Sequence, residues 1–162
     1  MIKDKIVVID FGGQYNQLIA RRVRQRHVYS EVWPYTVDIE KLKDPSIKGI
    51  IFTGGPNSVY DEKSPHIAKE IFDLHKPILG ICYGAQLIAY LLGGEVKHAP
   101  ISEYGKTAVH VLKDDSILLE NVDKTTEVFM SHTDYISKIP EGFVLTANTD
   151  NCPTAAFECK ER

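Results

Sequence analysis

Residues 77–94 read PILGICYGAQLIAYLLGG, and this stretch predicts a strand, a sharp turn and a helix in direct succession. Its first five residues are an apolar run that begins with proline, which is typical of a short buried strand. Its second half is rich in strong helix formers and is closed by two glycines that favour a helix stop. Cys82 lies between the two predicted elements and is flanked by Gly80 and Gly84.

The pattern Gly80-x-Cys82-x-Gly84 at a strand-to-helix turn is typical of a nucleophile elbow. The turn is tight enough that a side chain at either flanking position would clash with its surroundings. It aims the thiol outward, and the unpaired N–H groups of a helix N-terminus should favour the reactive thiolate. A free cysteine is otherwise most often a small packed residue. We interpret Cys82 as a nucleophile because the predicted strand and helix supply the context that the motif requires.

The composition is that of an ordinary globular domain, with 162 residues, 43% hydrophobic, 25% charged and a net charge of −3. No basic cluster supports binding to nucleic acid or an anionic membrane, and no apolar run could span a bilayer. The N-terminus leads directly into a strand and does not have the pattern of a signal peptide. Three cysteines without paired spacing favour a reducing compartment, so we expect a cytoplasmic protein. No Cys/His cluster has zinc spacing, and we expect no metal.

The first half of the chain alternates between apolar runs and helical patterns. The runs are continuous, which marks strands buried on both faces of a parallel sheet. Strands and helices in this succession predict βαβ units, with helices on both faces of the sheet. Pro34 favours an edge position for its strand. The expected strands are 6–11, 29–35, 49–53 and 77–81, and the expected helices are 15–25, 64–75 (with Ser64 as N-cap) and 85–92.

Three of these strands end in unusual residues. An aspartate and two glycines close the first strand at 10–13, and a glycine-rich loop follows the third at 54–58. Cys82 follows the fourth strand. Because ligands of parallel α/β sheets bind outside the carboxyl ends of the strands, we expect an active site where these ends meet.

After residue 94 the apolar pattern becomes shorter and more alternating, which favours mixed or antiparallel strands. The polar cluster at 131–134 should follow one of these strands directly. The strands are expected at 95–98, 106–113, 127–130, 144–147 and 155–157.

Several stretches resemble one known family. The residues GICYGAQ at 80–86 are similar to the nucleophile motif of class I (triad-type) glutamine amidotransferases. The resemblance is closest to the N-terminal glutaminase domain of GMP synthetases and covers essentially the whole chain. It implies a three-layer α/β/α sandwich with an open, mostly parallel mixed sheet of the flavodoxin-like type. The narrower likeness rests on residues 10–24, 54–60, 103–106, 131–134 and 151–153.

This resemblance implies a role for several residues. Cys82 would attack the carboxamide of glutamine, release ammonia and form a glutamyl thioester that water hydrolyses. The backbone N–H groups of Gly55 and Tyr83 would form the oxyanion hole, which agrees with the general design of nucleophile elbows.

Three further residues match positions that hold the α-amino and α-carboxylate groups of glutamine in the family: Gln86, Ser131 and His132. For Gln86 the simpler alternative is a polar residue on the first turn of a helix. The pair His132-x-Asp134 is a poor candidate for a catalytic dyad, because it matches the family's substrate-binding loop.

The family's partner is an ATP-dependent synthetase domain that uses the ammonia to aminate XMP to GMP. ATP and Mg²⁺ would belong to that domain, and we expect no cofactor in this one. Two other readings stay open: a stand-alone cysteine hydrolase on a similar sheet, and a non-catalytic glutamine-binding module.

The sequence departs from the family in several places, of which the most serious concerns the catalytic base. The family's catalytic histidine and glutamate lie in a His-Pro-Glu motif after the position of Phe157, and no His-x-Glu occurs in these residues. We therefore expect residues 1–162 to be an amidotransferase domain truncated before that motif, with the synthetase domain absent. Thr133 also stands where the family usually has glycine.

Overall fold

The parallel sheet expected in the first half of the chain is present. The computed structural model describes residues 3–161, which divide into two units, the first ending at Ile88 and the second beginning at Ala89. In the first unit four parallel strands are ordered β2-β1-β3-β4, so that β2 with Pro34 lies at an edge as predicted. Its elements are β1 (Lys5–Asp10), α1 (Asn16–Gln25), β2 (Tyr29–Pro34), α2 (Ile39–Leu42), β3 (Ile47–Phe52), the 3₁₀ helix η1 (Lys69–Leu74), β4 (Ile78–Gly80) and the start of α3 (Tyr83–Leu91).

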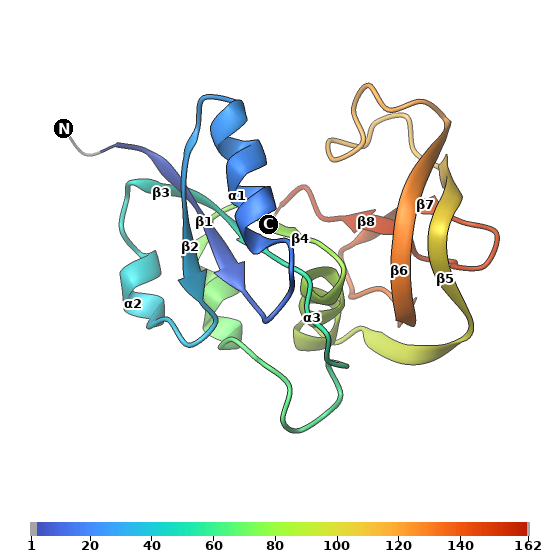
Figure 1. Ribbon diagram of the computed structural model, residues 1–162, viewed down its shortest axis with the longest axis horizontal. Coiled ribbons are helices and arrows are strands. Elements are labelled where there is room, and N and C mark those ends of the chain that lie inside the picture. Colours follow the sequence, from blue (N-terminus) through green and yellow to red (C-terminus); the bar gives the residue numbers. More distant parts are fainter. Residues whose placement is uncertain (1–2, 162) are drawn as a thin grey trace. The chain divides into compact units, whose positions relative to one another are not determined.

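Helices cover both faces of this sheet, as βαβ connections require. One face is covered by α1 (Figure 1). There Ala20 of α1 packs against Val8 and Ile51. Phe52 follows Ile51 in the same strand and therefore points to the opposite face. There its ring lies 6.4 Å from that of Phe72 in η1. The layering confirms the predicted α/β fold with a parallel sheet.

The helix predicted to begin at Ser64 is shorter than expected and is a 3₁₀ helix that starts at Lys69. The Ser64 hydroxyl donates to the carbonyl of Ser58 rather than capping a helix. The Pro65 carbonyl accepts a hydrogen bond from the Tyr83 hydroxyl. These two bonds hold the segment before η1 in an extended loop. None of the helices in residues 3–161 has the length and apolar character needed to cross a bilayer.

The second unit is an antiparallel sheet with the strand order β6-β5-β7-β8. We expected these strands to belong to one mixed sheet, but in the described residues they form a sheet of their own. Long strands β5 and β6 pair along most of their length. The four strands are β5 (Glu95–Val111), β6 (Thr125–Lys138), β7 (Val144–Asn148) and β8 (Ala156–Glu158).

The polar cluster at 131–134 lies inside β6, so the prediction that it follows a strand is wrong. The pairing register explains how a polar stretch is accommodated. His98 of β5 is opposite Asp134, and Glu103 is opposite His132. Four residues of β5 thus bulge out where β6 has only Thr133. The backbone pairing of β5 and β6 is interrupted at the cluster. Side chains on either side of the bulge connect the two strands there.

Candidate active site

The loops after β1, β3 and β4 converge, as the sequence predicts for the carboxyl ends of parallel strands. The glycines in these loops show how close the loops are to one another. A β-carbon added to a glycine would come close to atoms of the next loop. At Gly13 it would lie 2.5 Å from the carbonyl oxygen of Gly54, and at Gly54 it would lie 3.6 Å from Cβ of Cys82. The three predicted strand ends therefore form one site in the first unit.

Cys82 occupies a strained elbow between β4 and α3. Its φ of 53° places it in the left-handed region, which non-glycine residues rarely adopt. A β-carbon on Gly80 would lie 2.7 Å from the Ala85 nitrogen, and one on Gly84 would overlap the Phe52 carbonyl. The backbone closes the turn with a 3.0 Å hydrogen bond from the Gly84 N–H to the Ile81 carbonyl. This is the geometry predicted for a nucleophile elbow.

Cys82 is an exposed residue, but its thiol is not activated by its surroundings in the way we expected. Protein atoms packed around the sulfur raise the pKa of the Cys82 thiol above its ordinary value, and a hydrogen bond from the Tyr83 N–H opposes this only in part. Loss of water around the sulfur thus outweighs this hydrogen bond. The structure favours access to the sulfur over spontaneous ionisation.

The two predicted oxyanion-hole residues are held against one another. Tyr83 is 1% exposed, its ring lies 5.6 Å from that of Phe11, and its hydroxyl donates a 2.5 Å hydrogen bond to the Pro65 carbonyl. Burial raises the pKa of this hydroxyl to about 12, so it stays a donor. A β-carbon on Gly55 would lie 3.5 Å from the Tyr83 ring and 2.6 Å from the Phe11 carbonyl oxygen. The backbone at both positions is therefore fixed, and the oxyanion role of its N–H groups stays a prediction.

Gln86 lies one helical turn from the nucleophile. Its N–H donates to the Cys82 carbonyl at 3.1 Å, and its side chain is buried on the first turn of α3. The position agrees with the predicted contact to substrate, and it agrees equally with a polar helix residue, so the role of Gln86 stays a prediction.

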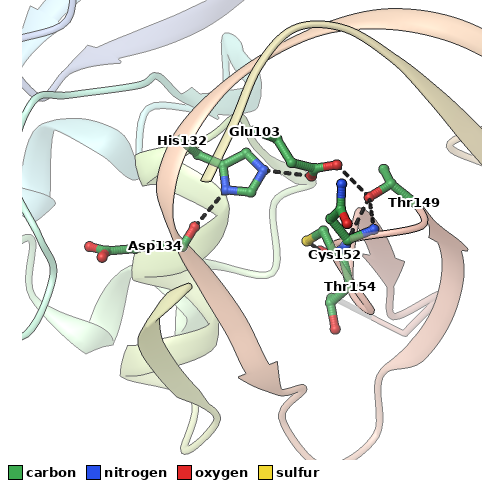
Figure 2. Close-up of polar contacts among 7 residues, drawn as sticks. Glu103, His132, Asp134, Thr149, Cys152 and Thr154 are labelled. Atoms are coloured by element: carbon green, nitrogen blue, oxygen red, sulfur yellow. Dashed lines mark hydrogen bonds and ion pairs between the residues drawn. The ribbon is translucent and has the colours of Figure 1, made fainter. Parts of the chain in front are cut away.

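The other two predicted substrate residues lie in the second unit, on β6. Ser131 is an exposed strand residue opposite Tyr104. His132 is largely enclosed, and both of its ring nitrogens are engaged (Figure 2). Nδ1 lies 2.8 Å from the backbone carbonyl oxygen of Asp134, and Nε2 lies 2.9 Å from Oε1 of Glu103.

These contacts bear on the pair His132-x-Asp134, which the sequence makes a poor candidate for a catalytic dyad. The Asp134 group that faces the His132 ring is its backbone carbonyl. The Asp134 carboxylate instead lies 3.5 Å from Nδ1 of His98. His132 therefore has no free nitrogen with which to accept the proton of a thiol.

A buried polar cluster beside His132 was missed by the sequence analysis. Glu103 of β5 accepts a 2.7 Å hydrogen bond from the hydroxyl of Thr149, which in turn accepts the Cys152 N–H at 2.9 Å. One donor atom each from Glu103, His132 and Cys152 lie within 4.8 Å of one another. Burial, reinforced by the Glu103 charge, raises the pKa of the Cys152 thiol. The stretches 103–106 and 151–153 carried the family resemblance, but only the strand register shows that they meet.

Comparison with known proteins decides the family. A model described as glutamine amidotransferase class-I matches residues 7–162. The chain belongs to this family. The resemblance inferred from the sequence is confirmed, while the roles of individual amidotransferase residues are still predictions.

The most similar relatives include GMP synthases (glutamine-hydrolyzing). That of Clostridium perfringens is 58% identical over 161 residues, which are 99% of this chain and 31% of the relative. That of Clostridium tetani is 56% identical over 162 residues, which are 100% of this chain and 32% of the relative. This amidotransferase chain thus spans about a third of the length of the curated relatives that it matches.

Solved structures agree on the amidotransferase fold. A protein of Thermoplasma acidophilum, proposed to be part of a GMP synthase, has a TM-score of 0.83 at 30% identity, covering 99% of this chain and 80% of that one. A glutamine amidotransferase of Thermotoga maritima has a TM-score of 0.76 at 18% identity, covering 98% and 72%. The second likeness bears on the fold alone.

Proposed function

We propose that this chain hydrolyses glutamine through a thioester on Cys82 and supplies the ammonia to a synthetase. One observation carries the proposal: the left-handed elbow that presents Cys82 directly beside the glycine loop after β3. A backbone strained at a single exposed cysteine is unfavourable for stability and is typical of a reacting residue. Membership of the amidotransferase family gives the substrate class.

The chemistry proceeds in two acyl-transfer steps. The Cys82 thiolate attacks the carboxamide carbon, forming a C–S bond while the π electrons of C=O move to oxygen. Collapse of this intermediate breaks the C–N bond, and the nitrogen takes up a proton and leaves as ammonia. Water then adds to the thioester, the C–S bond breaks, and glutamate and the thiol are released.

Each step passes through an oxyanion that needs hydrogen-bond donors. We assign the N–H groups of Gly55 and Tyr83, whose backbone is fixed by close packing, to this role. One such donor contributes on the order of 3 kcal/mol to transition-state stability. Donors that are fixed before the reaction need no reorganisation when the charge develops.

The raised pKa of the Cys82 thiol has a consequence for the first step. A thiol that is mostly neutral at pH 7 needs a general base, and the same proton must reach the departing nitrogen. His132 does not fill this role, because both of its nitrogens are already engaged. We assign the glutamine α-amino and α-carboxylate groups to Gln86 and to the backbone and side chains of Ser131 and His132.

The partner proposed for the ammonia is an ATP-dependent synthetase domain that aminates XMP to GMP. Its support is the name and length of the relatives, which are GMP synthases about three times as long as this chain. ATP and Mg²⁺ would bind to that domain. Transfer within one assembly would keep ammonia from being protonated and diluted in water.

Replacement of the nucleophile tests this function. In the complete protein, Cys82→Ala should lower glutamine-dependent GMP formation by at least about a thousandfold while ammonium-dependent GMP formation persists. Cys159→Ala is the matched control, because Cys159 is not among the residues assigned to the site. Unchanged glutamine-dependent synthesis in Cys82→Ala would exclude the mechanism. A wild-type protein that binds glutamine without releasing ammonia would instead be a non-catalytic glutamine-binding module.

A further inference from the structure

The second unit contains a chain of side-chain hydrogen bonds that ends on the segment assigned to glutamine. It begins at Thr149, just after β7, crosses Glu103 on β5 and reaches His132 on β6 (Figure 2). The Glu103 and His132 side chains are only 2% and 13% exposed. Charged groups are rarely enclosed to this degree unless each is paired and hydrogen-bonded.

The direction of each hydrogen bond in this chain is determined by chemistry. The Asp134 carbonyl can only accept, so Nδ1 of His132 carries a proton and donates to it. The Thr149 hydroxyl accepts the N–H groups of Asn151 and Cys152, and it therefore donates its own hydrogen to Oε2 of Glu103. A proton must then lie between Oε1 of Glu103 and Nε2 of His132, since two lone pairs would otherwise face each other at 2.9 Å.

The network lies where the regular backbone pairing between β5 and β6 is interrupted. Thr133 is opposite the four-residue bulge of β5 and so has no regular partner. On one side of Thr133 the His132 ring is hydrogen-bonded to Glu103. On the other side the Asp134 carboxylate lies near His98. The bond from His132 to the Asp134 carbonyl spans Thr133 and fixes the backbone between them.

We propose that Glu103 and Thr149 are positioning residues that hold the His132 ring, and through it the backbone of 131–134, in the shape that receives the α-groups of glutamine. The inference rests on the proposed function, which assigns this segment to substrate. Neither positioning residue contacts glutamine. They should therefore affect how tightly glutamine binds and leave the chemistry at Cys82 unchanged.

Two pairs of variants distinguish a role in positioning the substrate-binding segment from a role in the stability of the fold alone. Gln at position 103 has the shape of Glu, can donate an N–H to Nε2 of His132 and can still accept from Thr149. Glu103→Gln should therefore behave nearly as wild type, whereas Glu103→Ala breaks both bonds. Thr149→Ser keeps the hydroxyl and Thr149→Val removes it, which provides a milder pair if Glu103→Ala fails to fold.

The measurement is alkylation of Cys82 in the complete protein by a glutamine-shaped diazo ketone, whose diazo carbon takes up a proton and forms the S–C bond as N₂ leaves. Peptide mass spectrometry follows the modified Cys82. We expect Glu103→Ala and Thr149→Val to raise the half-saturating concentration about tenfold, the effect of losing one buried hydrogen bond. The limiting rate, and alkylation by iodoacetamide, which lacks the α-groups, should not change. Equal behaviour within each pair of variants, or a loss confined to the limiting rate, overturns the inference.

Two controls complete the test. If the wild-type protein shows no saturable alkylation of Cys82 by the diazo ketone, the proposed function itself fails, and the inference fails with it. Nitrogen-15 NMR of the His132 ring should show a protonated Nδ1 and a bridging proton at Nε2, and an unprotonated Nδ1 would overturn the network. One tightly bound zinc ion per chain would also overturn the network. Glu103, His132 and Cys152 would then share a metal in place of the proton between Glu103 and His132.

Discussion

The two regions assigned to glutamine are built in opposite ways. The elbow at Cys82 is shaped by backbone: a left-handed residue, flanked by glycines at which an added β-carbon would overlap neighbouring atoms. The segment at 131–134 is shaped by side chains, with a buried Glu103–His132 pair across an interrupted ladder. Backbone contacts tolerate no added atom, whereas a hydrogen-bond network accepts a substitute with the same donors and acceptors. The two regions should therefore respond differently to conservative change.

Apart from loss of the nucleophile itself, the largest effect is expected at Gly55, where a backbone donor would be lost. Gly55→Pro removes the N–H and should lower glutaminase turnover at least about a hundredfold. Single-turnover ammonia release from the complete protein measures this. Alkylation of Cys82 by iodoacetamide serves as the control for an intact elbow, since proline would also crowd the Phe11 carbonyl. Full turnover in a folded variant would remove Gly55 from the mechanism.

A smaller effect is expected from a single methyl group at the elbow. Gly84→Ala would press its β-carbon into the carbonyl carbon of Phe52, which lies 2.6 Å from that position, and should lower the free energy of unfolding by about 2 kcal/mol. The control is Gly142→Ala, where φ is positive but no atom lies within 4 Å, with an expected cost of about 1 kcal/mol. Denaturant unfolding compares the two. Equal costs would mean that the elbow is not sterically closed.

The smallest effect concerns ionisation at the elbow. Only the thiolate reacts with iodoacetamide, and the pKa of the Cys82 thiol is raised by burial. The alkylation rate of the folded protein should therefore keep rising beyond the pH at which a cysteine in the unfolded chain, with a pKa of about 8.5, has ionised. Rates measured across this range with and without denaturant test the sign. An inflection below that of the unfolded chain would show that the helix N-terminus outweighs burial.

The elbow could be predicted from the sequence because its determinants are local. Two glycines, a cysteine, an apolar run and a helical run lie within 18 residues, and each has one favoured conformation there. The convergence of the three strand ends followed from the rule for parallel sheets. The raised pKa of Cys82 could not be predicted, because it depends on atoms from other elements that pack around the sulfur.

The second unit could be predicted only in outline. Polar residues at 131–134 interrupt an apolar pattern, so the sequence indicates a break where β6 in fact continues. What compensates for the polarity is Glu103, 29 residues earlier in the chain, and Thr149, 17 residues later. Such pairing is set by strand register and by the bulge in β5, neither of which has a signature in a single sequence. The shortened helix at η1 has a similar cause, a hydroxyl from Tyr83 that holds the preceding loop.

The left-handed backbone at Cys82 has an evolutionary consequence. Glycine is the residue that this conformation suits best, and any other L-residue there gives up about 1 kcal/mol of stability or more. Selection for stability alone would therefore favour glycine at position 82, and the thiol would be lost. A cysteine that persists at such a position marks a compromise in which reactivity is retained against the preference of the fold, and a lineage that no longer needed the reaction would be expected to lose it here first.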